Sequence, residues 1–246
     1  MQRTSNPVLS KKTFVGLQVT GETDVMTING TVYKTALLLI ILVISSVLPW
    51  NAFVASGERS SVLGYVSIGA LGGFGVAILT VFKKNWAAFT SPVYAILEGF
   101  AVGGVSVLIE ARFPGVVLQA VCLTFGTLFA LLFLYRTGVI KATENFKLGV
   151  FAATSGIAIL YFSTWILGMF DIHLSFIHEG GLWGILFSLF VVVIAALNLV
   201  LDFDFIESGC KNGAPKYMEW YAAFGLIVTL VWLYLEILRL LGKSRK

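Results

Sequence analysis

The side chains with the greatest chemical capacity in this chain are carboxylates set in apolar sequence. The stretch VLDFDFIE carries Asp202, Asp204 and Glu207, and the last apolar stretch carries Glu236 in LYLE. Glu98 stands near the midpoint of another, AFTSPVYAILEGFAVGGVSVLI. A charged residue at the centre of a membrane-inserted helix costs roughly 2.5–3.5 kcal/mol, so such residues normally face a water-filled or protein-lined interior. These carboxylates therefore predict a polar path inside a membrane protein.

The chemistry expected of these groups is the handling of cations and protons. Carboxylate oxygens are hard ligands of the kind that calcium takes, so Asp202 is a candidate calcium contact, although no residue set predicts a firm metal site. Two carboxylates that face each other in a low dielectric share a proton and titrate as a coupled pair. We therefore predict a pH-sensitive ion path, with Asp202, Glu236, Glu98 and Asp204 as its candidate residues.

Helical spacing predicts which carboxylates face inward. Residues three and four apart share a face, so Asp202 ends a small and polar stripe in an otherwise bulky apolar span, while Asp204 lies about 200° further round. The last span repeats the pattern, which turns Glu236 inward with Arg239 one turn away as a candidate ion-pair partner. The two stripes are Gly184, Ser188, Ala195, Asn198, Asp202, and Ala222, Gly225, Thr229, Trp232, Glu236, Arg239. Two alternatives stay open: Asp202 as a solvated helix exit, and Glu236–Arg239 as a surface pair at the membrane boundary.

The composition predicts that membrane-spanning helices position these groups. Hydrophobic residues make up 58% of the 246 residues, charged residues only 12%, and the mean hydropathy is +0.91. Unbroken apolar runs of about 20 residues are the length at which a helix crosses the bilayer, whereas barrel strands are about 10 residues long and alternate. We therefore expect an all-α integral membrane protein. Its seven spans are 32–54, 62–82, 88–109, 115–135, 148–170, 181–201 and 217–241.

The loops are short, so the chain is expected to form one bundle without a separate soluble domain. We divide it into an N-terminal cytoplasmic tail (1–31), a seven-helix transmembrane domain (32–242) and a basic C-terminal tail (243–246). The first tail mixes polar and charged residues without periodicity, which is typical of loosely ordered sequence.

Several functional classes are disfavoured. The 17 Lys and Arg, with a net charge of +4, are spread over loops and tails without a cluster that could follow a nucleic-acid backbone. Ser155 has no histidine in any span to serve as its base, and no phosphate-binding loop or metal-ligand motif occurs. We expect no enzyme activity, no cofactor and no nucleic-acid partner.

The distribution of Lys and Arg predicts the orientation. Eleven lie on the side of the N-terminus and only Arg59 and Arg112 lie in the loops of the other side. Since Lys and Arg are enriched in cytoplasmic loops, the N-terminus is expected to be cytoplasmic. The four cations of the C-terminal end join the sparse side if seven helices cross, and a re-entrant last segment or six crossings would relieve that conflict.

Four segments resemble one family over nearly the whole chain after residue 25. They are MTINGTVYKTALLLIIL, SPVYAILEGFAVGGVSVLIEARFPGVVLQAV, LYRTGVIKATENFKLGV and ALNLVLDFDFIESGCKNGAPKYMEWYAAFGLIVTLVWLYLEILRLL. In this order they resemble the bacterial branch of the Bax inhibitor family, the transmembrane Bax inhibitor motif proteins. The resemblance implies a seven-helix bundle with the last helix surrounded by the other six, in a bacterial inner (plasma) membrane.

The resemblance also implies a pH-sensitive calcium leak governed by two carboxylates, one on the sixth helix and one on the seventh. Family members are linked to suppression of cell death and to stress. Asp202 matches the carboxylate of the sixth helix. For the second carboxylate, LYLE selects Glu236, alignment from the C-terminal end selects Thr229, and Glu98 is a possible substitute.

A competing hypothesis is a membrane adaptor without transport activity. Small-residue faces on spans 62–82 and 88–109 would suit helix docking onto another membrane protein, such as a protease or a cell-death or stress effector. The expected partners are thus calcium or other cations and the lipid bilayer, with a second membrane protein under the adaptor hypothesis.

Overall fold

The computed structural model describes residues 25–170 and 181–245, and these form seven long helices and one short 3-10 helix. All seven are long and apolar enough to cross a membrane. The predicted fold class is therefore confirmed, while residues 1–24 of the expected tail and residues 171–180 lie outside the described part. The elements are α1 (Ile28–Ser56), α2 (Ser60–Phe82), η3 (Lys84–Trp86), α3 (Ala87–Arg112), α4 (Val116–Arg136), α5 (Glu144–Gly168), α7 (Leu182–Lys211) and α8 (Met218–Ser244).

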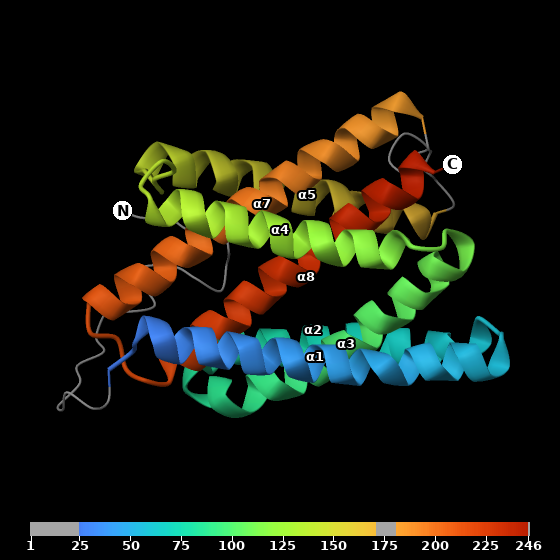
Figure 1. The fold of residues 1–246 in the computed structure, drawn as a ribbon, viewed down its shortest axis with the longest axis horizontal. Helices are drawn as coiled ribbons and strands as arrows, with labels where there is room; N and C mark the ends of the chain where they lie inside the picture. The colour runs from blue at the N-terminus through green and yellow to red at the C-terminus, as the bar shows by residue number, and fades with distance from the viewer. Residues whose placement is uncertain (1–24, 171–180, 246) are drawn as a thin grey trace.

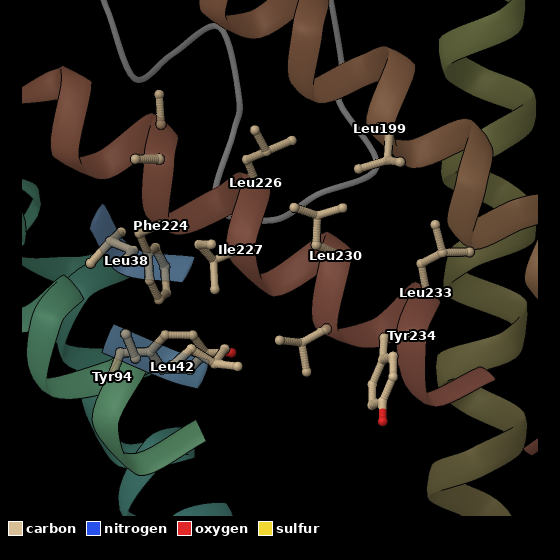
Figure 2. Packing of buried hydrophobic residues seen from close by; sticks show 14 of the residues in the cluster. Leu38, Leu42, Tyr94, Leu199, Phe224, Leu226, Ile227, Leu230, Leu233 and Tyr234 are labelled. Carbon is tan, nitrogen blue, oxygen red and sulfur yellow. The ribbon is translucent and has the colours of Figure 1, made fainter. Parts of the chain in front are cut away.

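The last helix, α8, is the innermost element of the bundle (Figure 1). It packs directly against α1, α3, α4 and α7, while α5 packs on α7 and α2 packs on α3 and α1. Figure 2 shows Phe224, Ile227 and Leu230 of α8 among buried side chains of its neighbours, such as Leu38 and Leu199. The structure thus confirms a bundle built around its final helix.

The helix that carries the acidic stretch is longer than the apolar run predicts. The expected span ended at residue 201, but α7 continues to Lys211, so Asp202, Asp204 and Glu207 are all helical. The turn that follows uses Gly213 at a φ of 63°, a left-handed conformation that suits glycine. Because the helix extends beyond the apolar run, the acidic residues lie on a helix that packs against α4, α5 and α8 instead of in a loop.

The backbone before α1 is tied to the turn between α7 and α8. Met26 donates its backbone N–H to the carbonyl of Ala214 at 2.6 Å, and Val25 forms an isolated antiparallel bridge with Pro215. Thr27 then caps α1 by accepting a hydrogen bond from the N–H of Gly30 at 3.0 Å. The start of the first helix and the start of the last helix are therefore held at the same end of the bundle.

The C-terminus lies at the opposite end of the bundle from the start of α1, and α8 runs between the two ends without turning back (Figure 1). Arg245 donates to the carbonyl of Pro114 at 2.8 Å and to the side chain of Gln119 at 3.1 Å, both in or next to the connection between α3 and α4. The basic end of the chain therefore does lie on the side with fewer cations.

The helices α1, α2 and α3 approach each other through glycine. A Cβ atom at Gly103 would lie 2.5 Å from the carbonyl oxygen of Ser46, and one at Gly69 would lie 2.5 Å from the carbonyl oxygen of Leu97. Both obstacles are backbone atoms, which cannot move without shifting a helix. The small-residue faces on α2 and α3 are thus used at these positions for packing within the chain.

We predict that Gly103→Ala destabilises the protein in detergent by about 1–3 kcal/mol, because the added methyl group forces α1 and α3 apart. Gly75→Ala is the matched control, since nothing lies within 4 Å of a Cβ atom at that position. Thermal unfolding followed by circular dichroism measures both. Equal midpoints for the two variants would contradict the close packing.

Candidate functional site

Asp202 lies at the centre of the candidate site and is fully enclosed by protein. Its exposure is 0%, and α7 is buried without interruption from Asn198 to Phe203. One turn before it, the amide of Asn198 donates to the hydroxyl of Thr154 on α5 at 2.9 Å. The alternative of a solvated helix exit is excluded, because α7 continues for nine residues beyond Asp202.

Asp204 faces another direction, as its angular position on the helix predicts. Its carboxylate accepts a hydrogen bond from the ammonium group of Lys147 on α5 at 2.6 Å. The Lys147 side chain is 4% exposed and that of Asp204 is 23% exposed. This pair links α5 to α7 near one end of the bundle and does not belong to the inner face that carries Asp202.

Glu236 is buried in a compact group with Tyr161 of α5 and Arg239 of its own helix. The Tyr161 hydroxyl donates to the carboxylate at 3.1 Å, and Arg239 forms an ion pair with it at 3.0 Å. Arg239 also donates to the Tyr161 oxygen at 2.7 Å. Glu236 is only 2% exposed, so the ion pair lies inside the protein, with only the Arg239 side chain reaching the surface.

The register of α7 against α8 separates Glu236 from Asp202. The two helices are antiparallel, and Lys243 donates to the hydroxyl of Ser188 at 2.8 Å, which fixes their relative position. Counting back from this contact and from the turn places Asp202 at the level of residues 226–229. Glu236 then lies roughly 12 Å further along α8 at 1.5 Å per residue. Thr229 therefore lies much nearer than Glu236 to the level of Asp202.

The face of α8 that carries Thr229 also turns toward α7. Trp232, one turn further on, packs against a buried cluster formed by Val191 and Ile194 of α7 with Ile157 of α5. The Thr229 hydroxyl donates to the Gly225 carbonyl at 3.3 Å and the residue is 3% exposed. Asp202 and Thr229 are thus both buried near the contact between α7 and α8, which we call the α7–α8 seam, while the amide of Asn198 reaches Thr154 on α5.

Glu98 lies at the same depth but on the other side of α8. The Tyr94 ring packs on Phe224 with centroids 4.9 Å apart, and Ser106 hydrogen bonds to Tyr234 at 2.7 Å, so Glu98 is level with residues 226–228. Its carboxylate points toward α2, where a Cβ atom at Gly73 would lie 3.2 Å from Oε2. Glu98 therefore shares the depth of Asp202 but faces a different helix.

Glu219, in the first turn of α8, is 1% exposed. It forms an ion pair with Lys34 of α1 and accepts hydrogen bonds at 2.9 Å from both the backbone N–H and the hydroxyl of Thr27. Lys34 also lies over the Trp220 ring at 5.5 Å. This arrangement joins the first turn of α8 to the first two turns of α1.

Lys34, Lys147, Tyr161 and Lys243 are the polar partners that sequence reasoning missed. Each comes from a different helix than the acidic or hydroxyl group it contacts, so no spacing within one helix could reveal it. For Lys34 and Tyr161 the available signal was a cation or a tyrosine inside an apolar span, whereas Lys147 and Lys243 lie just outside the predicted spans. In the described part of the chain, no three His, Cys, Asp or Glu side chains come together as a metal site.

Comparison with known proteins agrees with this arrangement. The family model described as Bax inhibitor 1 like matches residues 6–246, nearly the full length of the chain. The chain belongs to the Bax inhibitor 1 like family. It is accordingly a multi-pass integral membrane protein from a family of the channel or transporter type. No curated protein and no solved structure matches it.

We predict that Glu219→Ala destabilises the protein by about 3 kcal/mol, because it leaves Lys34 and Thr27 without their buried acceptor. Lys34→Ala should cost less, since its side chain is 18% exposed and the remaining carboxylate keeps both Thr27 hydrogen bonds. Unfolding in detergent measures both variants and their combination. Additive effects in the double variant would show that the pair is not coupled.

Proposed function

We propose that the protein is a pH-sensitive leak for cations, with calcium as its cargo, and that the cation passes along the α7–α8 seam. The observation that carries the proposal is the complete burial of Asp202 inside a membrane-spanning helix, next to the most buried helix of the bundle. Intramembrane carboxylates are costly and normally serve an ion or proton path. Membership of the family supports the same function.

The oxygens along the seam suit a brief contact with calcium better than a tight site. Calcium takes six to eight oxygen ligands in its stable sites. The seam offers the Asp202 carboxylate and the Thr229 hydroxyl, so most ligands of a passing cation would have to be backbone carbonyls or its own water. A site with one carboxylate binds weakly, and weak binding lets the ion leave again, as conduction requires.

A proton competes with the cation for Asp202, and this competition supplies the pH dependence. When Asp202 is protonated, the seam holds no negative charge at this level and the cation loses its main attraction. When Asp202 is ionised, an arriving cation offsets the cost of a charge in a low dielectric. Because Thr229 stands at the level where a second carboxylate would complete a pair, we propose control by one acid instead of two sharing a proton.

The direct test is calcium flux into proteoliposomes at several pH values. Asp202→Asn should lower the flux at least tenfold and abolish its pH response, because the amide keeps the shape but carries no charge. Glu58→Gln, in the loop between α1 and α2, is the control for the loss of an acid and should leave the flux unchanged. Flux and pH response unaltered in Asp202→Asn would refute the proposal.

A second variant tests the role of Thr229 in the same assay. Thr229→Asp places a second carboxylate at the level of Asp202, and the two acids should then titrate as a coupled pair. We expect the pH dependence of the flux to broaden and shift. Glu236→Gln, which removes the charge further along the helix, should leave the pH dependence of the flux close to that of the unchanged protein.

The adaptor hypothesis has less support. Of the glycines that suggested helix docking, those at 69, 99 and 103 lie against α1 or α3 of the same chain, whereas nothing in the chain lies within 4 Å of a Cβ atom at Gly64 or Gly75. A stoichiometric membrane partner in mild detergent, together with the absence of flux in proteoliposomes, would favour the adaptor over the leak.

We also propose that the N-terminus is cytoplasmic in a bacterial inner membrane. Eleven Lys and Arg are assigned to that side against six on the other, and three of the six form hydrogen bonds to protein groups. Arg239 pairs with Glu236, Lys243 donates to Gly184 and Ser188, and Arg245 donates to Pro114 and Gln119.

Fusions to the C-terminus in a bacterial host test this orientation. Alkaline phosphatase placed after the last residue should be active, because that enzyme folds only outside the cytoplasm, while green fluorescent protein at the same place should stay dark. A fluorescent and phosphatase-negative result would reverse the orientation.

A further inference from the structure

A cavity of about 580 Å³ lies between α1 and α4, with α7 and α8 as its floor. It is separate from the α7–α8 seam, since none of Asp202, Asn198 and Thr229 lines it. Its volume falls within the roughly 300–1,000 Å³ of typical ligand pockets. Figure 1 shows α1 and α4 running side by side across α8, so the cavity forms a groove on the flank of the bundle.

The walls of this groove are apolar and open toward the bilayer. Val32 on α1 and Phe129 on α4 are 59% and 64% exposed, whereas the floor residues Phe203, Ile206 and Leu226 are each less than 10% exposed. Thr31 and Thr35 line α1, but their hydroxyls donate to carbonyls of their own helix at 2.9 Å. These two hydroxyl groups therefore have little remaining hydrogen-bonding capacity for a ligand in the groove.

The length of the groove corresponds to one leaflet of the membrane. On α1 it runs from Ile28 to Leu39, and on α4 from Arg136 back to Phe125. Each stretch spans eleven steps, or about 16 Å at 1.5 Å per residue. This is close to half of the 30 Å or so of the hydrocarbon core. The groove thus fits an extended acyl chain of the leaflet at the N-terminal end of the bundle.

The polar end of the groove carries a cation at the membrane boundary. Arg136 is exposed at the end of α4, and no described residue accepts a hydrogen bond from its guanidinium group. The neighbouring carboxylate of Glu207 is already engaged by the Tyr135 hydroxyl at 2.5 Å and by Lys211 at 2.5 Å. Arginine binds phosphate oxygens through two parallel hydrogen bonds, so this end complements a lipid phosphate.

We infer that this groove binds one anionic phospholipid, with an acyl chain between α1 and α4 and its phosphate on Arg136. Arg136, Lys211 and Glu207 together carry a net charge of one positive unit, which a headgroup with one negative charge neutralises. A zwitterionic lipid would satisfy Arg136 but would bring an extra cation to a positive site. The groove should therefore prefer phosphatidylglycerol to phosphatidylcholine.

The test is native mass spectrometry of the whole protein released from nanodiscs that contain equal amounts of these two lipids. The unchanged protein should retain one phosphatidylglycerol. Arg136→Gln should lower that retention about tenfold. Ala36→Trp, which fills the wall at an exposed position, should lower the retention of both lipids. Arg112→Gln, at the opposite end of the bundle, is the matched control and should retain the lipid normally.

Three results would overturn the inference: equal retention of the two lipids by the unchanged protein, retention unaffected by both groove variants, or the same loss in Arg112→Gln. A partner helix that co-purifies and excludes the lipid would also overturn it.

Thermal unfolding of each variant checks that a loss of lipid is not caused by a loss of structure. Because Arg136 and Ala36 are exposed, their replacement should leave the unfolding midpoint unchanged. The outcome is independent of calcium flux.

Discussion

The enclosure of polar side chains around α8 is the constraint on which the rest of the structure depends. In hydrocarbon no water satisfies a buried charge, so each ionisable group in the bundle needs a partner on another helix or a functional reason for its place. Glu219 meets Lys34, Asp204 meets Lys147, and Glu236 meets Tyr161 and Arg239. These contacts tie α8 to α1 and α5, and α7 to α5, across surfaces that apolar packing alone would leave free to slide.

The acidic residues of α7 and α8 divide into two kinds. Glu219, Asp204 and Glu236 are each paired with a cation and hold helices together. Asp202 lies in the fully buried part of α7 beside Asn198, facing the level of Thr229, and is the acid best placed for a role in ion passage. The groove between α1 and α4, in which we infer a bound phospholipid, lies on a different surface from that seam.

Much of this could be predicted from the sequence because membrane insertion imposes simple rules. The length of the apolar runs predicted seven helices. Helical spacing predicted that Asp202 faces inward, that Asp204 faces another direction and that Arg239 lies next to Glu236. The sequence did not predict where α7 ends. The apolar run stops at residue 201, but α7 continues to Lys211 because its acidic turns are covered by α4, α5 and α8. The choice between Glu236 and Thr229 needed the register of two antiparallel helices, and the partners of Glu219 could not be predicted because they lie about 190 residues earlier.

The central claim is that a cation and a proton compete for Asp202 inside the bundle. Infrared difference spectroscopy on the reconstituted protein tests it most directly, by recording the band of protonated carboxyl groups at mildly acidic pH before and after calcium is added. The account predicts that calcium removes part of this band in the unchanged protein and that the change is missing in Asp202→Asn. An unchanged spectrum, or the same loss in Asp202→Asn, would contradict it.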